Sequence, residues 1–134
     1  MIRGLMALAL TLLLAACAGR EAPQDDGVCW RVHMGAGDAI SFTPLARNVR
    51  SLETCAVLLE AARLRGEAEV NGAYQGYYLF VNASAISSAR HMAGFRYPIF
   101  QPPQRAGIDR DLKKMMASRG GAMPDAADLS VERK

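Results

Sequence analysis

The stretch SLETCAVLLEAARLRG, residues 51–66, decides the fold, because it carries the strongest helical signal in the chain. Its apolar residues recur at the spacing of one helix face: Leu52, Cys55, Ala56, Leu59 and Ala62. Ser51 can accept a hydrogen bond from a free amide at the helix start, and Gly66 suits the position after its end. The pattern predicts an amphipathic helix within residues 48–65, with Cys55 facing the layer that the helix covers.

Alternating residues before this helix predict a β-hairpin. Its apolar face is formed by Trp30, Val32 and Met34 before the turn and by Ile40 and Phe42 after it. The turn is GAGD, residues 35–38. Strict alternation would place Cys29 on the opposite face with Arg31. We therefore expect the strand to begin at Trp30 and Cys29 to lie in the preceding turn.

The residues after the helix predict a second hairpin. Asn71-Gly72 is a typical two-residue turn. Residues 73–81 are apolar or aromatic on both faces, which is typical of a central strand that is covered on both sides. Short strands near residues 85–87 and 95–99 complete the sheet. The sequence thus predicts an α+β domain over residues 28–100, a small antiparallel sheet with one main helix packed on it.

The N-terminus has the order of features of an export signal. Arg3 precedes an apolar run at residues 5–16, which is shorter than the roughly 20 residues that a membrane-spanning helix needs. Small residues follow this run. Ala16-Cys17-Ala18 fits the cleavage site of an ordinary signal peptide, which would release a soluble protein.

A second interpretation of the same segment uses four residues, Leu14-Ala15-Ala16-Cys17, which resemble the lipobox of bacterial lipoproteins at every position. The resemblance implies removal of signal peptide 1–16 and attachment of fatty acyl chains, such as palmitate, to Cys17. Several chains together would hold the protein on an envelope membrane. Ala18, in place of an aspartate, favours the outer membrane, with the domain facing the periplasm. An ordinary cleaved signal and a retained anchor stay open as alternatives.

Two cysteines remain once Cys17 is committed to lipid. Cys29 and Cys55 form an even pair in an exported protein, which favours a disulfide between them. Such a bridge would staple the first strand to the helix. The alternative is a reactive or metal-binding pair, although the chain has no C-x-x-C spacing to support it.

Four aromatic residues are the best candidates for a binding surface. They are Trp30, Tyr74, Tyr77 and Tyr78. Such rings combine a large contact area with a polar tip, so together they could bind a glycan strand or a partner protein. The same alternation also allows most of them to pack in the core.

Other candidate chemistry is weakly supported. His33-Met34 and His91-Met92 offer ligand types that suit Cu(I), but adjacent strand residues point to opposite faces. Ser84, Ser87 and Ser88 lie near His91 without the G-x-S-x-G motif of a hydrolase. We therefore expect no catalytic residue, no resident metal and no cofactor.

The two ends of the mature chain are polar. Residues 17–27 carry the lipidated cysteine and predict a flexible tether. Residues 101–134 predict a polar tail with one short amphipathic helix, which places four apolar residues on one side: Ile108, Leu112, Met115 and Met116.

The charge balance excludes one class of partner. The chain has 16 basic and 13 acidic residues, a net charge of +3, without the one-sided clustering that nucleic-acid binding needs. We expect a lipoprotein of the bacterial envelope, not an enzyme, whose domain is an interaction or accessory module for an envelope protein or glycan. The alternative is a binding protein for a small envelope ligand, a glycan fragment or copper.

Overall fold

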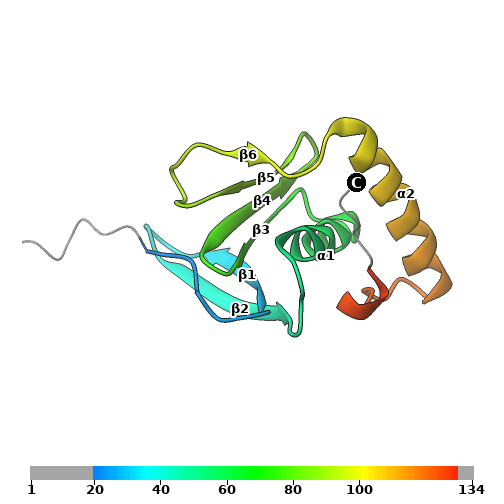
Figure 1. Ribbon diagram of the computed structural model, residues 1–134, viewed down its shortest axis with the longest axis horizontal. Coiled ribbons are helices and arrows are strands. Elements are labelled where there is room, and N and C mark those ends of the chain that lie inside the picture. The colour runs from blue at the N-terminus through cyan, green and yellow to red at the C-terminus, as the bar shows by residue number, and fades with distance from the viewer. Residues whose placement is uncertain (1–19, 130–134) are drawn as a thin grey trace, which may run out of the picture.

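The computed structural model describes residues 20–129, and the expected lipidation site at Cys17 lies outside them. The elements, in chain order, are β1 (Cys29–Met34), β2 (Ile40–Ala46), α1 (Leu52–Leu64), β3 (Glu69–Tyr74), β4 (Tyr77–Asn82), β5 (Ile86–Ala89), β6 (Tyr97–Pro98), α2 (Pro102–Ser118) and the 3-10 turn η1 (Ala126–Asp128). The strands form one antiparallel sheet in the order β2-β1-β3-β4-β5-β6. Helix α1 packs on this sheet (Figure 1), so the predicted α+β fold is confirmed.

Helix α1 begins and ends as its sequence predicts. The Ser51 hydroxyl accepts a hydrogen bond from the Thr54 amide at 3.1 Å. The predicted apolar face contacts the sheet, and Cys55 lies on it, bonded to Cys29 with their Cα atoms 5.3 Å apart. The disulfide is therefore confirmed, and both of its cysteines are fully buried.

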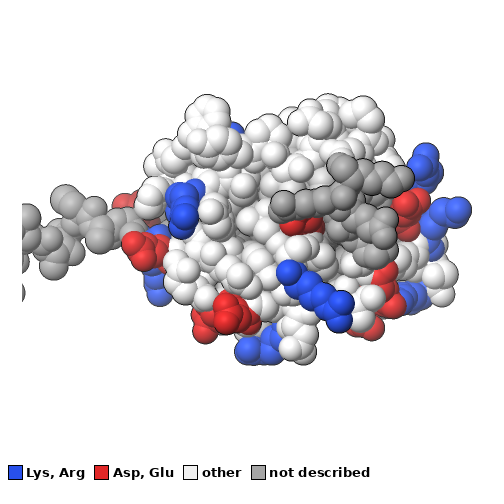
Figure 2. Space-filling view, viewed as in Figure 1, with Lys and Arg blue, Asp and Glu red and all other residues white. Residues whose placement is uncertain are grey.

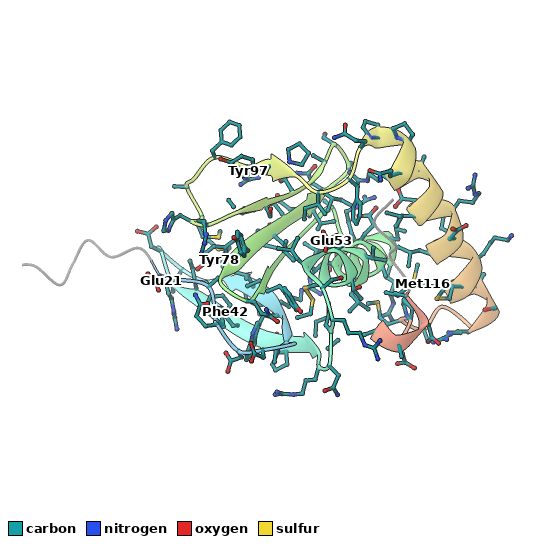
Figure 3. The ribbon with its side chains drawn as sticks, in the orientation of Figure 1. Glu21, Phe42, Glu53, Tyr78, Tyr97 and Met116 are labelled. Carbon is teal, nitrogen blue, oxygen red and sulfur yellow. A yellow bond between two sulfur atoms is a disulfide. The ribbon has the colours of Figure 1, made fainter. Side chains whose placement is uncertain are left out.

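Helix α1 is also buried on its outer side, because α2 packs against it. Leu112 and Met116 of α2 form a small apolar cluster with Val57 and Ala61 of α1. Figure 3 shows Met116 on the side of α2 that faces α1. The expectation of a short helix in a polar tail was wrong in extent, since α2 begins immediately after residue 101 and forms an outer layer of the domain.

The sheet has apolar side chains on both faces, and this explains the position of Cys29. Cys29 lies within β1 and faces α1, while Trp30 and Val32 face the other side. A bulge between Cys29 and Trp30 shifts the register with β2. The expectation that Cys29 precedes the strand was wrong, because α1 covers the face of Arg31 and not the face of Trp30.

The turn of the second hairpin also differs from the prediction. It lies at Gln75-Gly76, whose φ angles of 41° and 84° suit a two-residue turn with two left-handed positions. Asn71 and Gly72 lie inside β3 and pair with Phe80 and Leu79 of β4. Turn chemistry at Asn71-Gly72 was outweighed by packing, because α1 lies directly over Gly72.

Gly72 is the position where the sheet allows the closest approach of α1. A Cβ atom there would lie 2.8 Å from the backbone oxygen of Trp30 and also collide with Leu59. We expect Gly72→Ala to lower the free energy of unfolding by about 2 kcal/mol, because neither neighbour can move freely in a packed core. Urea denaturation measures this change. Gly107→Ala is the control, since its Cβ would meet only Arg110 Nη2 at 3.7 Å and should be neutral or stabilising; equal losses in both variants would contradict the explanation.

The segment before β1 was expected to be a flexible tether, but residues 20–23 pack on the sheet face opposite α1. Ala22 is only 2% exposed. The Tyr78 hydroxyl donates to the Arg20 carbonyl at 2.5 Å, and the Gly76 amide donates to the Pro23 carbonyl at 2.9 Å. In Figure 3 Glu21 lies beside Phe42 and Tyr78. Any tether is therefore shorter than predicted and ends before Arg20.

No helix within residues 20–129 has both the length and the apolar character that a membrane crossing requires.

Candidate functional site

The four aromatic residues that were expected to form one binding surface lie on different faces of the sheet, and two of them are buried. Tyr74 faces α1, is 5% exposed and donates its hydroxyl to the Val49 carbonyl at 2.7 Å. Tyr78 faces the other side of the sheet and is fully buried. Burial raises the pKa of both hydroxyls.

The other two aromatic residues are half-buried. Trp30 lies on the same face as Tyr78, and the guanidinium of Arg90 lies 4.5 Å from the ring centre of Tyr77. The wrong position of the turn explains this error. With a turn at Asn71-Gly72, residues 73–81 would form one strand, in which Tyr74 and Tyr78 point to the same face.

The exposed aromatic residues lie instead at the end of the β5–β6 connection and at the start of β6. Phe95 is 75% exposed and Tyr97 is 63% exposed. Their rings meet edge to face, with centroids 4.8 Å apart. Figure 3 shows Tyr97 at the outer edge of the sheet, away from both helices. Two exposed rings in contact with each other form an apolar patch that suits contact with a binding partner.

The surroundings of this aromatic pair are basic. Residues 83–108 contain no aspartate or glutamate. Arg90 precedes the pair in sequence and Arg96 lies between its two members. The guanidinium of Arg96 lies 3.7 Å from the ring centre of Phe80. In Figure 2 the acidic side chains on the visible face lie away from β5 and β6, which are at the top of the view. The pair thus suits a partner that brings apolar and acidic groups together.

A second group of functional side chains lies between α1 and α2. Glu60 is fully buried, and its carboxylate accepts two hydrogen bonds from Arg63, at 2.8 and 2.7 Å. Arg105 of α2 approaches the same carboxylate with Nη2 at 3.2 Å and also donates to the Asn82 carbonyl. Burial opposes the charge of Glu60, but hydrogen bonds from Arg63, Asp109 and Arg105 outweigh it and lower the pKa of Glu60.

Asp109 is the fourth member of this cluster, and its pKa is shifted in the opposite direction to that of Glu60. Its side chain is 22% exposed and lies one helical turn after Arg105, with Oδ2 3.9 Å from Arg105 Nε. Burial, together with the hydrogen bond and the charge of Glu60, raises the pKa of Asp109 to about 6. Asp109 therefore holds its proton to a higher pH than an ordinary aspartate, which reduces the repulsion between the two neighbouring carboxylates below about pH 6.

A cavity of about 470 Å³ opens beside this cluster. Its walls come from the β4–β5 turn, the segment before α2 and the first turns of α2, and Arg105 and Asp109 line it. Arg105 Nη1 and Asp109 Oδ1 are buried and have no hydrogen-bond partner within residues 20–129. One signal for this site was overlooked in the sequence, a single carboxylate inside the apolar run Val57-Leu58-Leu59-Glu60-Ala61-Ala62.

The raised pKa of Asp109 predicts a pH-dependent stability. Because the folded pKa of about 6 lies above the ordinary 3.8, the stabilising proton is fully held below about pH 4 and is lost as pH rises through 6. We expect wild-type protein to lose about 1.4 kcal/mol of unfolding free energy between pH 5 and 7.5. Asp109→Asn, whose side chain is uncharged at every pH, should lose much less in urea denaturation at the two pH values.

The control for this measurement is Asp111→Asn. Asp111 is on the same helix but is 74% exposed, so this variant should keep the wild-type pH dependence. A wild-type stability that rises from pH 5 to 7.5, or an equal slope in Asp109→Asn, would contradict the coupling of Asp109 to Glu60.

The other candidates from the sequence lie apart from these features. GAGD connects β1 to β2, His33 hydrogen-bonds to Thr43 at 2.7 Å, and Met34 is exposed. Ser87 is buried, whereas Ser84 lies at the cavity wall. Within residues 20–129 no three metal-binding side chains converge on one point.

The chain matches no family model, no curated protein and no solved structure.

Proposed function

We propose that this protein is a lipid-anchored component of the bacterial envelope whose folded domain is a non-catalytic interaction module. The lipobox-like residues Leu14-Ala15-Ala16-Cys17 support the anchor, and Ala18 supports delivery to the outer membrane with the domain in the periplasm. The described part of the domain starts at residue 20, so the proposed anchor at Cys17 lies only a few residues before it in sequence. Its N-terminal segment and α2 lie at opposite ends of the fold (Figure 1), so α2 points away from the anchored end.

The exposed pair of Phe95 and Tyr97 is the observation that carries the interaction role. Aromatic residues supply much of the binding energy at protein interfaces. The absence of acidic residues from 83 to 108 gives the patch a positive environment, and electrostatic complementarity favours a partner of opposite charge. The occupant that fits best is an envelope protein with an acidic, apolar surface. A glycan is the alternative partner.

Replacement of both Phe95 and Tyr97 by serine tests this role. We expect the variant to remain folded and to bind its envelope partner at least about tenfold more weakly, because each ring is an anchor worth about 1–2 kcal/mol. Partners crosslinked to the membrane-extracted wild type are identified, and binding of the purified partner is then measured. Met34→Ser is the matched control, since Met34 is 55% exposed on the β1–β2 hairpin; equal binding by all three proteins would reject the aromatic pair.

The anchor is tested separately by intact mass. Protein extracted from its own membranes should begin at Cys17 and carry acyl chains. Cys17→Ala should not be processed in this way. A lipid-free chain that begins beyond Cys17 would overturn the anchor and leave the interaction module untouched.

A further inference from the structure

The cavity beside Arg105 and Asp109 has the features of a ligand site, and the proposed aromatic interface does not use it. It lies where the β4–β5 turn meets the start of α2, and most of its wall is apolar. The apolar lining comes from Ile86, Pro98, Phe100, Pro102 and Ala106. Its volume of about 470 Å³ is in the range of small-molecule sites.

Arg105, which lines the cavity, has a buried hydrogen-bond donor without an acceptor among the described residues. Arg105 Nη2 is used by Glu60 and by the Asn82 carbonyl, but Arg105 Nη1 has no partner within residues 20–129. A buried guanidinium nitrogen without an acceptor is destabilising. A guanidinium pairs best with a carboxylate or a phosphate, because its donors form a planar fork.

The charges of the cluster leave room for one anion. With Asp109 neutral, the cluster contains two cations, Arg63 and Arg105, and one anion, Glu60. One further carboxylate balances the charge. A phosphate with two negative charges would leave a net negative charge in the cluster. The apolar wall favours a ligand whose remaining part is apolar. We propose that this cavity binds a carboxylate that carries an apolar body, with the guanidinium of Arg105 donating to the carboxylate.

When it is ionised, Asp109 competes with the carboxylate of the ligand for the positive charge of the cluster. The charged groups that act on it are Glu60 and Arg63 from α1 and Arg105 from its own helix. When Asp109 ionises, it supplies the second negative charge itself, and a ligand carboxylate would be the third. Since the pKa of Asp109 is about 6, affinity should fall as the pH rises from 5.5 to 7.5.

Two sources share this ligand chemistry, a free alkyl carboxylic acid and the C-terminal residue of a peptide. The probes are therefore octanoate, with octanamide as its neutral match, and acetyl-Gly-Gly-Ala-Leu, with its C-terminal amide as match. Isothermal titration of the folded protein at pH 5.5 should show binding of one carboxylate probe and not of its amide. At pH 7.5 the affinity of that probe should be at least about tenfold lower.

Two variants separate the site from general apolar binding. Ser84→Trp places a large ring at the exposed cavity wall without touching the charged cluster, and it should abolish binding at pH 5.5. Asp109→Asn should bind at both pH values with less than a threefold difference, while the exposed control Asp111→Asn should behave like the wild type. The proposal is overturned if neither carboxylate binds at pH 5.5, if the amides bind equally well, or if wild-type affinity does not change with pH. Binding unaffected by Ser84→Trp would also overturn it.

Discussion

Replacing Cys29 and Cys55 together by alanine is expected to lower the free energy of unfolding by about 3.5 kcal/mol. The two cysteines are 26 residues apart, and closing a loop of that length in the unfolded chain accounts for a stabilisation of this size in the loop-entropy model. The bridge joins the start of β1 to the first half of α1, so it fixes the helix on the sheet. A small domain has little other stability with which to offset the loss.

Urea denaturation of the wild type and the double variant measures this effect, and reduction provides the internal control. Because both cysteines are fully buried, mild reductant should leave the folded wild type intact. Unfolding in the presence of reductant should bring the wild type to the midpoint of the variant, and the variant should not respond to reductant. A loss below about 1 kcal/mol would show that the helix is held by packing alone.

The parts of the fold that the sequence predicted correctly are those governed by local periodicity. The repeat of apolar residues defined α1, the alternation around GAGD defined the β1–β2 hairpin, and the even cysteine pair defined the disulfide. The first two signals act over a few neighbouring residues, whereas the disulfide follows from the even number of cysteines left in an exported chain. They were sufficient to identify the fold class.

The wrong predictions concern residues whose roles depend on distant contacts. Gly72 is in a strand because Leu59 of α1 lies over it, and no local pattern reports that contact. Helix α2 was underestimated because only Leu112 and Met116 are buried along its length, so its apolar signal is weak. The candidate site was missed for the same reason, since Glu60 meets Arg105 from a helix 45 residues further along the chain.

The largest effect of a single substitution is expected at Glu60. Glu60→Ala leaves Arg63 and Arg105 without their shared carboxylate, and these side chains are only 16% and 11% exposed. Breaking a buried ion pair by removing one partner costs about 3–5 kcal/mol, because the remaining charge stays out of water. The loss should be visible in urea denaturation and as faster amide exchange along α2, since Arg105 connects that helix to α1.

The control for this substitution is Glu67→Ala. Glu67 pairs with Arg31 at the surface and is 45% exposed, so its loss should cost less than about 1 kcal/mol. Equal effects of Glu60→Ala and Glu67→Ala would contradict the role of burial.

A triple replacement of Glu60, Arg63 and Arg105 by leucine or methionine separates charge from packing. A buried ion network contributes little net stability when it is replaced as a whole by apolar side chains of similar volume, because the cost of removing the charges from water disappears with them. We therefore expect the triple variant to recover most of the stability that Glu60→Ala loses. If it recovers, the cluster is not needed to hold α2 on α1, and the buried charges beside the cavity require another role. If the triple variant is as unstable as Glu60→Ala, the hydrogen bonds of the cluster themselves fix α2 in place.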